Sequence, residues 1–156
     1  MNIYVAQVMT GGEDSVCARL QDRKIPAFSP HEYRMERRGK AWHSRERYLL
    51  PGYVLIPLDA LTDILYYKIR ETSGVIGILG KPPVTLSPEE SQYWASFMDG
   101  PIFPTDFLLT DGKLNAVSGI WRGMTFPILS IKRRQKRVKI CVPFFGAERE
   151  ITVSLP

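Results

Sequence analysis

Cysteine and histidine are scarce in this chain, which limits the metal and redox chemistry that it can carry. The two cysteines, Cys17 and Cys141, are too few for a secreted disulfide framework or a four-thiolate zinc site, and each lies in an apolar stretch. We interpret both as buried thiols. The two histidines, His31 and His43, have no cysteine or acidic residue at metal-ligand spacing. The sequence therefore predicts neither a bound metal nor a cofactor.

Long apolar runs are also absent. No segment approaches the roughly 18 consecutive apolar residues that a membrane helix requires. The chain opens with Met1-Asn2-Ile3 and lacks the basic stretch and apolar run of an export signal. We therefore expect a cytoplasmic monomer with no membrane partner.

Motifs for catalysis are missing as well. Gly80-Lys81 is not part of the G-x-x-x-x-G-K-[ST] run that cradles nucleotide phosphates, and Ser118 lacks the preceding glycine of a nucleophile elbow. We therefore expect a protein that is not an enzyme. One alternative is a metal-dependent nuclease that uses Glu36 and Glu46.

Acidic residues are rare in the C-terminal third. From Gly112 onward the chain has 9 Lys and Arg but only 2 acidic residues, a net charge of +7, whereas the preceding residues carry −2. Such an asymmetry predicts a polyanionic partner for the C-terminal part.

The N-terminal hundred residues alternate between strand and helix patterns. The order is βαββαβ, typical of a ferredoxin-like α+β fold in which two helices pack on one face of an antiparallel sheet. Thr10 and Glu13 predict a capping box for the first helix. The expected elements are a strand Ile3–Met9, a helix from Gly11 or Gly12, a strand Ala27–Met35, a basic hairpin Glu36–Arg47, a strand Tyr48–Leu58, a helix Leu61–Ile69 and a strand Val75–Leu79.

A third helix begins at Ser87, an N-cap followed by proline and two acids, and buries an aromatic face that includes Trp94 and Phe97. Glycine and prolines then predict a linker. Only short alternating strands follow, which indicates a small β-barrel: Leu114–Val117, Met124–Ile131, Lys136–Pro143 and Glu148–Val153. The predicted domains are residues 1–100 and 112–156, joined by a linker of residues 101–111.

Two basic clusters are the candidate nucleic-acid sites, because phosphates suit concentrated positive charge and unpaired bases stack on aromatic rings. Trp121 would add stacking to the first cluster. A merely solvated or protein-binding turn is the alternative for the barrel cluster, and a hairpin charged for solubility is the alternative for the other. The barrel cluster is Arg122, Lys132, Arg133, Arg134, Lys136, Arg137 and Lys139, and the hairpin cluster is Arg34, Arg37, Arg38, Lys40, Trp42, His43 and Arg45.

Several short motifs occur in a characteristic order and spacing. They are Ile3-Tyr4-Val5 followed by Thr10-Gly11, Leu50-Pro51-Gly52-Tyr53-Val54, Ser73-Gly74-Val75-Ile76-Gly77, Leu86-Ser87-Pro88-Glu89-Glu90, and Phe145-Gly146 with Ile151-Thr152-Val153. Together they resemble the NusG family of bacterial transcription elongation factors over nearly the whole chain. The resemblance implies an N-terminal NGN domain and a C-terminal KOW domain with an SH3-like barrel.

The resemblance also implies partners. In the family the NGN domain docks on the β′ clamp helices of RNA polymerase, and here Ile3, Tyr4, Leu50 and Tyr53 match its apolar pocket, although the same residues also suit the core. By analogy the KOW domain would bind RNA, and the hairpin would lie near upstream or non-template DNA. Alternatives are a general NusG acting through Rho or ribosomal protein S10, and a ribosome-associated KOW protein that binds RNA.

Two positions depart from the family pattern. Ile3 stands where tryptophan is usual, and Phe126 stands at the second glycine of the KOW motif. With the basic barrel, these departures indicate a specialised paralogue similar to RfaH or LoaP, one that increases polymerase processivity on particular operons.

Overall fold

The computed structural model describes residues 1–100, 107–117 and 121–156, and it divides into two compact units. Unit 1 comprises Met1–Pro30 and Leu50–Met98, and unit 2 comprises His31–Leu49 and Asp99–Pro156. Each is described by itself. The predicted domain division at residues 100 and 112 stays a prediction.

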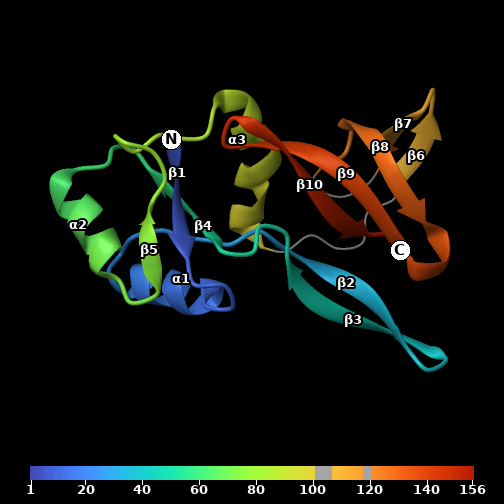
Figure 1. Ribbon diagram of the computed structural model, residues 1–156, viewed down its shortest axis with the longest axis horizontal. Coiled ribbons are helices and arrows are strands. Elements are labelled where there is room, and N and C mark those ends of the chain that lie inside the picture. The colour runs from blue at the N-terminus through green and yellow to red at the C-terminus, as the bar shows by residue number, and fades with distance from the viewer. Residues whose placement is uncertain (101–106, 118–120) are drawn as a thin grey trace. The chain divides into compact units, whose positions relative to one another are not determined.

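Unit 1 is built on a three-stranded antiparallel sheet (Figure 1). Strand β1 (Asn2–Val8) lies between β4 (Tyr53–Leu58) and β5 (Val75–Ile78). Single bridges continue the pairing on both sides, from Phe28 to Leu55 and from Tyr4 to Thr85. The predicted strand Ala27–Met35 is therefore wrong as one element, since only Phe28 pairs with this sheet.

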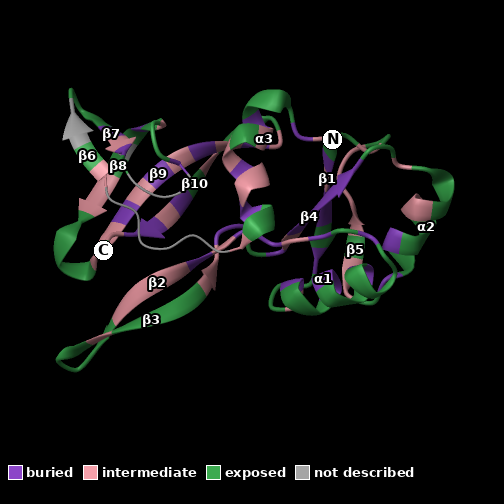
Figure 2. Cartoon of the chain, turned by 180° about the vertical axis from the view of Figure 1, so that it is seen from behind, coloured by how far each residue is buried: buried purple, intermediate pink, exposed green. Residues whose placement is uncertain are grey.

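Helices α1 (Glu13–Asp22) and α2 (Asp63–Glu71) supply the apolar side chains that cover one face of this sheet. Alternate residues of β1 and β4 point toward them, because successive side chains of a strand face opposite sides. The resulting core, purple in Figure 2, draws on both helices. Ile64 of α2, which its helical spacing assigns to the buried face, is instead 69% exposed. The core comprises Ala6, Val8, Val16, Cys17, Leu20, Ile25, Ala27, Val54, Ile56, Leu58 and Ile69.

The helix starts agree with the sequence in one case and differ in the other. Helix α3 (Pro88–Trp94) has the complete capping box of Ser87 and Glu90, with hydrogen bonds of 3.1 and 2.8 Å, and continues as a 3-10 helix, η1 (Ala95–Asp99). The capping box predicted for α1 is wrong. Its N-cap is Gly12, which has no side chain that could cap the helix, and the Glu13 carboxylate accepts from the amide of Gly11.

The C-terminal part of unit 2 is a five-stranded antiparallel sheet, as the alternating strands predicted. Phe126 is 1% exposed and contacts Phe107 and Trp121, with ring centroids 6.1 and 5.4 Å apart, so a large aromatic ring fills the core at this position. The strands run in the order β10 (Ala147–Ser154), β9 (Arg137–Phe144), β8 (Thr125–Lys132), β7 (Lys113–Ala116) and β6 (Phe107–Thr110).

Strand β6 falls in the segment predicted as linker. It pairs with β7, so residues 107–110 are part of the sheet, while residues 101–106 lie outside the described residues. Cys141 is half-buried rather than buried, because it alternates onto the outer side of β9. In the described part of the chain, no helix is long and apolar enough to span a membrane.

Unit 2 also contains the basic hairpin. Strands β2 (His31–Arg38) and β3 (Ala41–Tyr48) pair along their whole length and turn at Gly39, whose φ of +63° favours glycine. The hairpin was predicted to begin at Glu36 and is longer than expected. Its base lies against β10 of the same unit.

Candidate nucleic-acid interface

The four residues predicted to bind the polymerase do not form one exposed patch. Ile3 and Leu50 are 1% and 0% exposed. Tyr4 pairs with Ile56 and packs against the core on the sheet face that the helices cover. Tyr53 pairs with Gln7, and its side chain therefore lies on the opposite face of the sheet. Tyr53 is the half-buried member with access to that face. The docking role of these residues stays a prediction.

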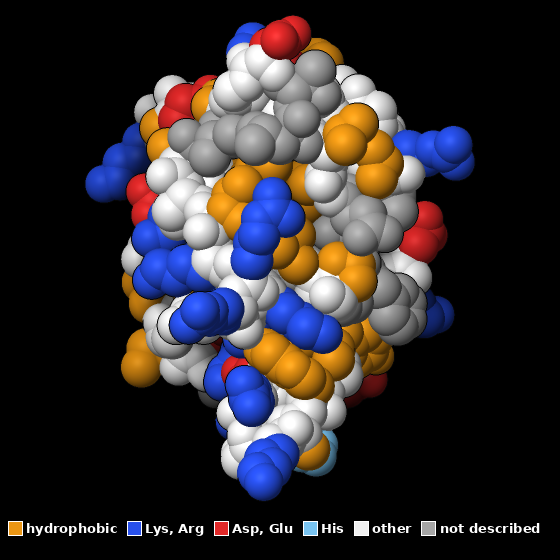
Figure 3. Space-filling view, turned by 90° about the vertical axis from the view of Figure 1, so that its right-hand side faces the viewer, with side chains coloured by type: hydrophobic (Ala, Val, Ile, Leu, Met, Phe, Trp, Pro, Cys, Tyr) orange, Lys and Arg blue, Asp and Glu red, His pale blue; other side chains and the backbone are white. Residues whose placement is uncertain are grey.

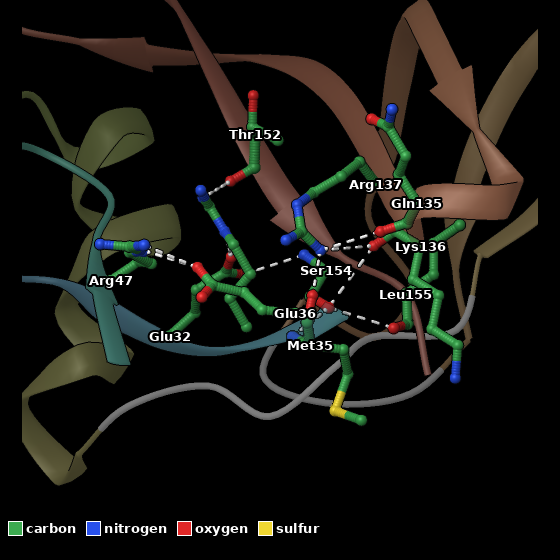
Figure 4. Close-up of polar contacts among 11 residues, drawn as sticks. Glu32, Met35, Glu36, Arg47, Gln135, Lys136, Arg137, Thr152, Ser154 and Leu155 are labelled. Carbon is green, nitrogen blue, oxygen red and sulfur yellow. Dashed lines mark hydrogen bonds and ion pairs between the residues drawn. The ribbon is translucent and has the colours of Figure 1, made fainter. Parts of the chain in front are cut away.

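The base of the hairpin is joined to the barrel by a buried carboxylate. Glu32 is 1% exposed; its Oε2 accepts from the Ser154 backbone amide at 3.0 Å, and its Oε1 accepts from Arg34 Nε at 2.8 Å (Figure 4). Burial raises the pKa of Glu32, and these hydrogen bonds act in the opposite direction. The carboxylate is therefore costly to leave without its partners.

Two arginines complete this junction. Arg34 also donates to the Thr152 carbonyl at 2.8 Å, and Arg137 donates to the Met35 carbonyl and to those of Gln135 and Lys136 at 3.0 and 3.3 Å. Burial lowers the pKa of Arg137. Both side chains thus hold the hairpin on the barrel. The sequence had predicted that these two arginines contact nucleic acid.

The Ser154 hydroxyl adds a contact that the sequence did not reveal. It accepts from the Met35 amide at 3.0 Å and donates to the Leu155 carbonyl at 3.1 Å. Ser154 is fully buried. A lone serine near the end of a strand carries no signal of such a contact, because the partner is 119 positions away.

Glu36 forms ion pairs with two further arginines. Arg47 donates two hydrogen bonds to its Oε1, at 3.0 and 2.7 Å, and Arg45 lies 3.8 Å from its Oε2. The hydrogen bonds from Arg47 are the main cause that lowers the pKa of Glu36. This carboxylate therefore does not repel a phosphate as a free one would.

Six further basic side chains of the two predicted clusters are exposed. Among the described residues, none of the following six has an acidic partner within ion-pair distance. Figure 3 shows Lys and Arg side chains gathered on the side of the molecule where the hairpin ends, with few acidic ones among them. The six are Arg37, Arg38, Lys40, Lys132, Arg133 and Arg134.

The two clusters meet at a cleft of about 500 Å³ in unit 2. Its lining comes from β2 and β3 of the hairpin and from the turn between β8 and β9, which contains a short 3-10 helix, η2 (Arg133–Gln135). Lys136 Nζ lies 4.7 Å from the centre of the Trp42 ring, close enough for a cation–π contact. The lining residues are Glu36, Arg37, Trp42, Arg134, Gln135 and Arg137.

Other predicted residues lie elsewhere. Lys139 forms an ion pair of 3.0 Å with Glu150 on the outer side of the sheet. Arg122 is exposed, but its neighbour Trp121 is 1% exposed, so the stacking predicted for Trp121 is wrong. His43 lines a separate cleft of about 310 Å³ on the hairpin.

No group of three or more potential metal ligands occurs among the residues that the structure describes.

Comparison with known proteins agrees with this architecture. The family model described as "Transcription termination factor nusG" matches residues 1–93. The chain is similar to the transcription termination/antitermination protein NusG of Bacillus subtilis, with 27% identity over 96% of this chain and 93% of the relative. It is similar to the Chlamydia trachomatis NusG, with 35% identity over 56% of this chain and 53% of the relative.

A solved structure shares the fold. The structure titled "Domain interaction in Thermotoga maritima NusG" matches with a TM-score of 0.58 and 17% sequence identity, covering 99% of this chain and 93% of that one. The likeness supports an α+β domain followed by a small barrel, as the sequence predicted.

Proposed function

The chain belongs to the NusG family of transcription termination/antitermination factors, and from this premise we propose that it binds RNA polymerase with its NGN domain and RNA with its basic barrel. The consequence of the two contacts together would be increased processivity on particular operons. The NGN domain would dock on the β′ clamp helices, and Tyr53 is the predicted docking residue that is half-buried on the sheet face opposite the helices.

The observation that carries the RNA-binding part is the group of six exposed basic residues without acidic partners in the described chain. Nearby arginines are held by Glu32 and Glu36, so the charge left over is concentrated at the end of the hairpin and in the β8–β9 turn. A phosphate backbone matches such a field and releases counterions on binding. Arginine guanidinium groups also bind phosphates in a bidentate manner.

A transcription assay with purified RNA polymerase tests the proposal. The full chain should increase read-through of a terminator or pause site. Tyr53→Ala should lose co-purification with β′ and lose read-through, while Tyr67→Ala, which removes an exposed tyrosine from α2, should keep both. Polymerase binding that is indifferent to Tyr53→Ala would overturn the docking assignment.

RNA binding is tested separately by titration at several salt concentrations. The double variant Arg133→Glu, Arg134→Glu should abolish tight binding and reduce the salt dependence. The control variant Lys113→Glu reverses one charge at an exposed position of β7, and it should have a smaller effect on RNA binding. If the double variant binds RNA unchanged, the basic turn is a solvated surface and not an RNA site.

Specialisation rather than a general role is favoured by Phe126, which occupies the core where the KOW motif has glycine. A general factor would use its barrel to hold Rho or ribosomal protein S10. Pull-down of either by the full chain, unaffected by excess RNA, would favour the general role. DNA contact by the hairpin and a ribosome-associated role remain predictions. The same titration tests the first of them, and the same pull-down tests the second.

A further inference from the structure

The cleft between the hairpin and the β8–β9 turn combines groups that lie about 100 positions apart in the sequence. Arg37 and Trp42 come from the hairpin, and Arg134 and Gln135 come from the turn. The hydrogen bonds of Glu32 and Arg137 fix the hairpin base against the barrel, so the two walls of the cleft are tied together within unit 2. The hairpin wall supplies the aromatic ring and the turn wall supplies Arg134, so the cleft needs both walls to combine them.

The charged lining residues differ in availability. Arg137 is engaged with three backbone carbonyls, and Glu36 is engaged with Arg47. Toward the described residues, Arg37 donates only its Nε, to the Gly39 carbonyl at 3.1 Å. Arg134 forms no ion pair with any described residue. Two guanidinium groups on opposite walls are therefore available for an anion.

The uncharged lining suits a nucleobase. Trp42 is half-buried, and Lys136 Nζ lies over one face of its ring, so a base would stack on the opposite face. A base–aromatic stack is tolerant of sequence. Gln135 has an exposed amide with both donor and acceptor groups, which can pair with a base edge. The cleft volume of about 500 Å³ lies within the usual range of small-ligand sites, roughly 300–1,000 Å³.

We propose that this cleft holds one unpaired nucleotide of a single-stranded RNA, with the base stacked on Trp42 and the flanking phosphates bound by Arg37 and Arg134. The inference rests on the proposed RNA binding of the barrel and makes it more specific. The hairpin is then part of the RNA site. A base within a duplex is already stacked and paired, so the site discriminates in favour of unpaired segments.

Intrinsic fluorescence gives a direct readout of the stack. Trp94 and Trp121 are 0% and 1% exposed, whereas Trp42 is half-buried and lines the cleft. Addition of an eight-nucleotide oligouridylate to the full chain should quench tryptophan emission, and Trp42→Phe should remove that quenching while retaining most of the affinity. An unchanged emission at saturating RNA would overturn the stacked arrangement.

A double-mutant cycle on the same oligouridylate tests whether the walls act together. Trp42→Ala should weaken binding about ten-fold, and Arg134→Ala about three- to ten-fold. Because both contact one nucleotide, the double variant should lose clearly less than the product of the two effects. Arg133→Ala removes the neighbouring charge, which does not line the cleft, and should combine additively with Trp42→Ala.

The outcomes separate this proposal from the proposed function. Independent, multiplicative effects of Trp42→Ala and Arg134→Ala, or weaker binding with Arg134→Ala but not with Trp42→Ala, would overturn the shared cleft and leave RNA binding by the turn intact. Absence of any oligouridylate or structured-RNA binding by the full chain would overturn both. Equal affinity for a duplex of the same length would overturn the preference for an unpaired nucleotide.

Discussion

The arginines at the base of the hairpin and those at its end do different work, although they belong to one basic stretch of sequence. At the base, Arg34 and Arg47 are bound by Glu32 and Glu36. Toward the end, Arg37 and Arg38 are exposed and have no ion pair with a described residue. The local acceptor, and not the charge of the segment, therefore decides whether an arginine holds the fold or faces a ligand.

The β8–β9 turn shows the same contrast. Arg137 donates to carbonyls of the hairpin and the turn, whereas Arg133 and Arg134 are exposed. Removing a member of the first group should therefore lower stability with little direct effect on RNA. Removing a member of the second should lower RNA affinity and leave stability almost unchanged.

The largest expected effect is that of Glu32→Ala. The variant leaves the Ser154 amide and Arg34 without their buried acceptor, and loss of one partner of such a pair costs about 3–5 kcal/mol in the free energy of unfolding. Amide hydrogen exchange along β10 measures it, because the Ser154 amide is itself a donor to Glu32.

Glu46→Ala is the matched control for that variant. Glu46 is an exposed carboxylate on β3, and its removal should change stability by less than about 0.5 kcal/mol. Equal protection of β10 in the two variants would contradict the structural role of Glu32.

Arg137→Met should have the next largest effect. It removes the charged Nη1 group, which the backbone carbonyls of Met35, Gln135 and Lys136 share as one donor, and a hydrogen bond to a charged group contributes about 1.5–3 kcal/mol. Urea unfolding should show a loss of about 2 kcal/mol for this variant and almost none for Arg133→Met. A comparable loss from Arg133→Met would break the distinction between the two groups.

The pH dependence of stability should differ in sign between Glu32 and Glu36. The pKa of Glu32 is raised by burial, so its contribution is fully present below the ordinary value of 4.5 and is lost as pH rises through the folded pKa. The pKa of Glu36 is lowered by Arg47, so its contribution is present above 4.5 and is lost as pH falls through the folded pKa.

Unfolding between pH 3 and 7 of the full chain, Glu32→Gln and Glu36→Gln checks these signs. The stability advantage of the unaltered chain over Glu36→Gln should shrink toward acid pH. Its advantage over Glu32→Gln should instead grow as pH falls toward 4.5. Parallel curves for the two variants would show that the two carboxyls do not differ as the structure indicates.

Lys139→Ala should have the smallest effect. The ion pair between Lys139 and Glu150 joins side chains that are 42% and 55% exposed, and such pairs contribute about 0.2–1 kcal/mol. Unfolding at low and high salt should show a small loss that disappears with salt. A large loss that persists at high salt would mean that Lys139 belongs with the structural group.

Local patterns predicted most of the elements. The alternation of Val138, Ile140 and Val142 places β9 with its apolar side inward, and Ser87 is the predicted N-cap of α3, where Glu90 completes a capping box. These features depend on residues within a few positions, for which periodicity and capping chemistry are sufficient.

The functional site was less accessible to such reasoning. The sequence identified the basic residues but could not divide them, because Glu32 and Ser154 meet only when the hairpin lies on the barrel, 122 positions apart. The same applies to the cleft, since nothing local connects Trp42 with Gln135. Trp121 was misassigned because a tryptophan beside an arginine can line a core as well as an exposed loop.

Photo-crosslinking tests the central claim most directly. A single-stranded RNA carrying one 4-thiouridine would be bound to the full chain, irradiated, and mapped by mass spectrometry. We predict crosslinks to both the Trp42 segment of the hairpin and the Arg133–Gln135 turn, and their joint loss in the double variant Arg37→Ala, Arg134→Ala. Crosslinks confined to one of these segments, or lying outside both, would contradict an RNA site shared by the hairpin and the barrel.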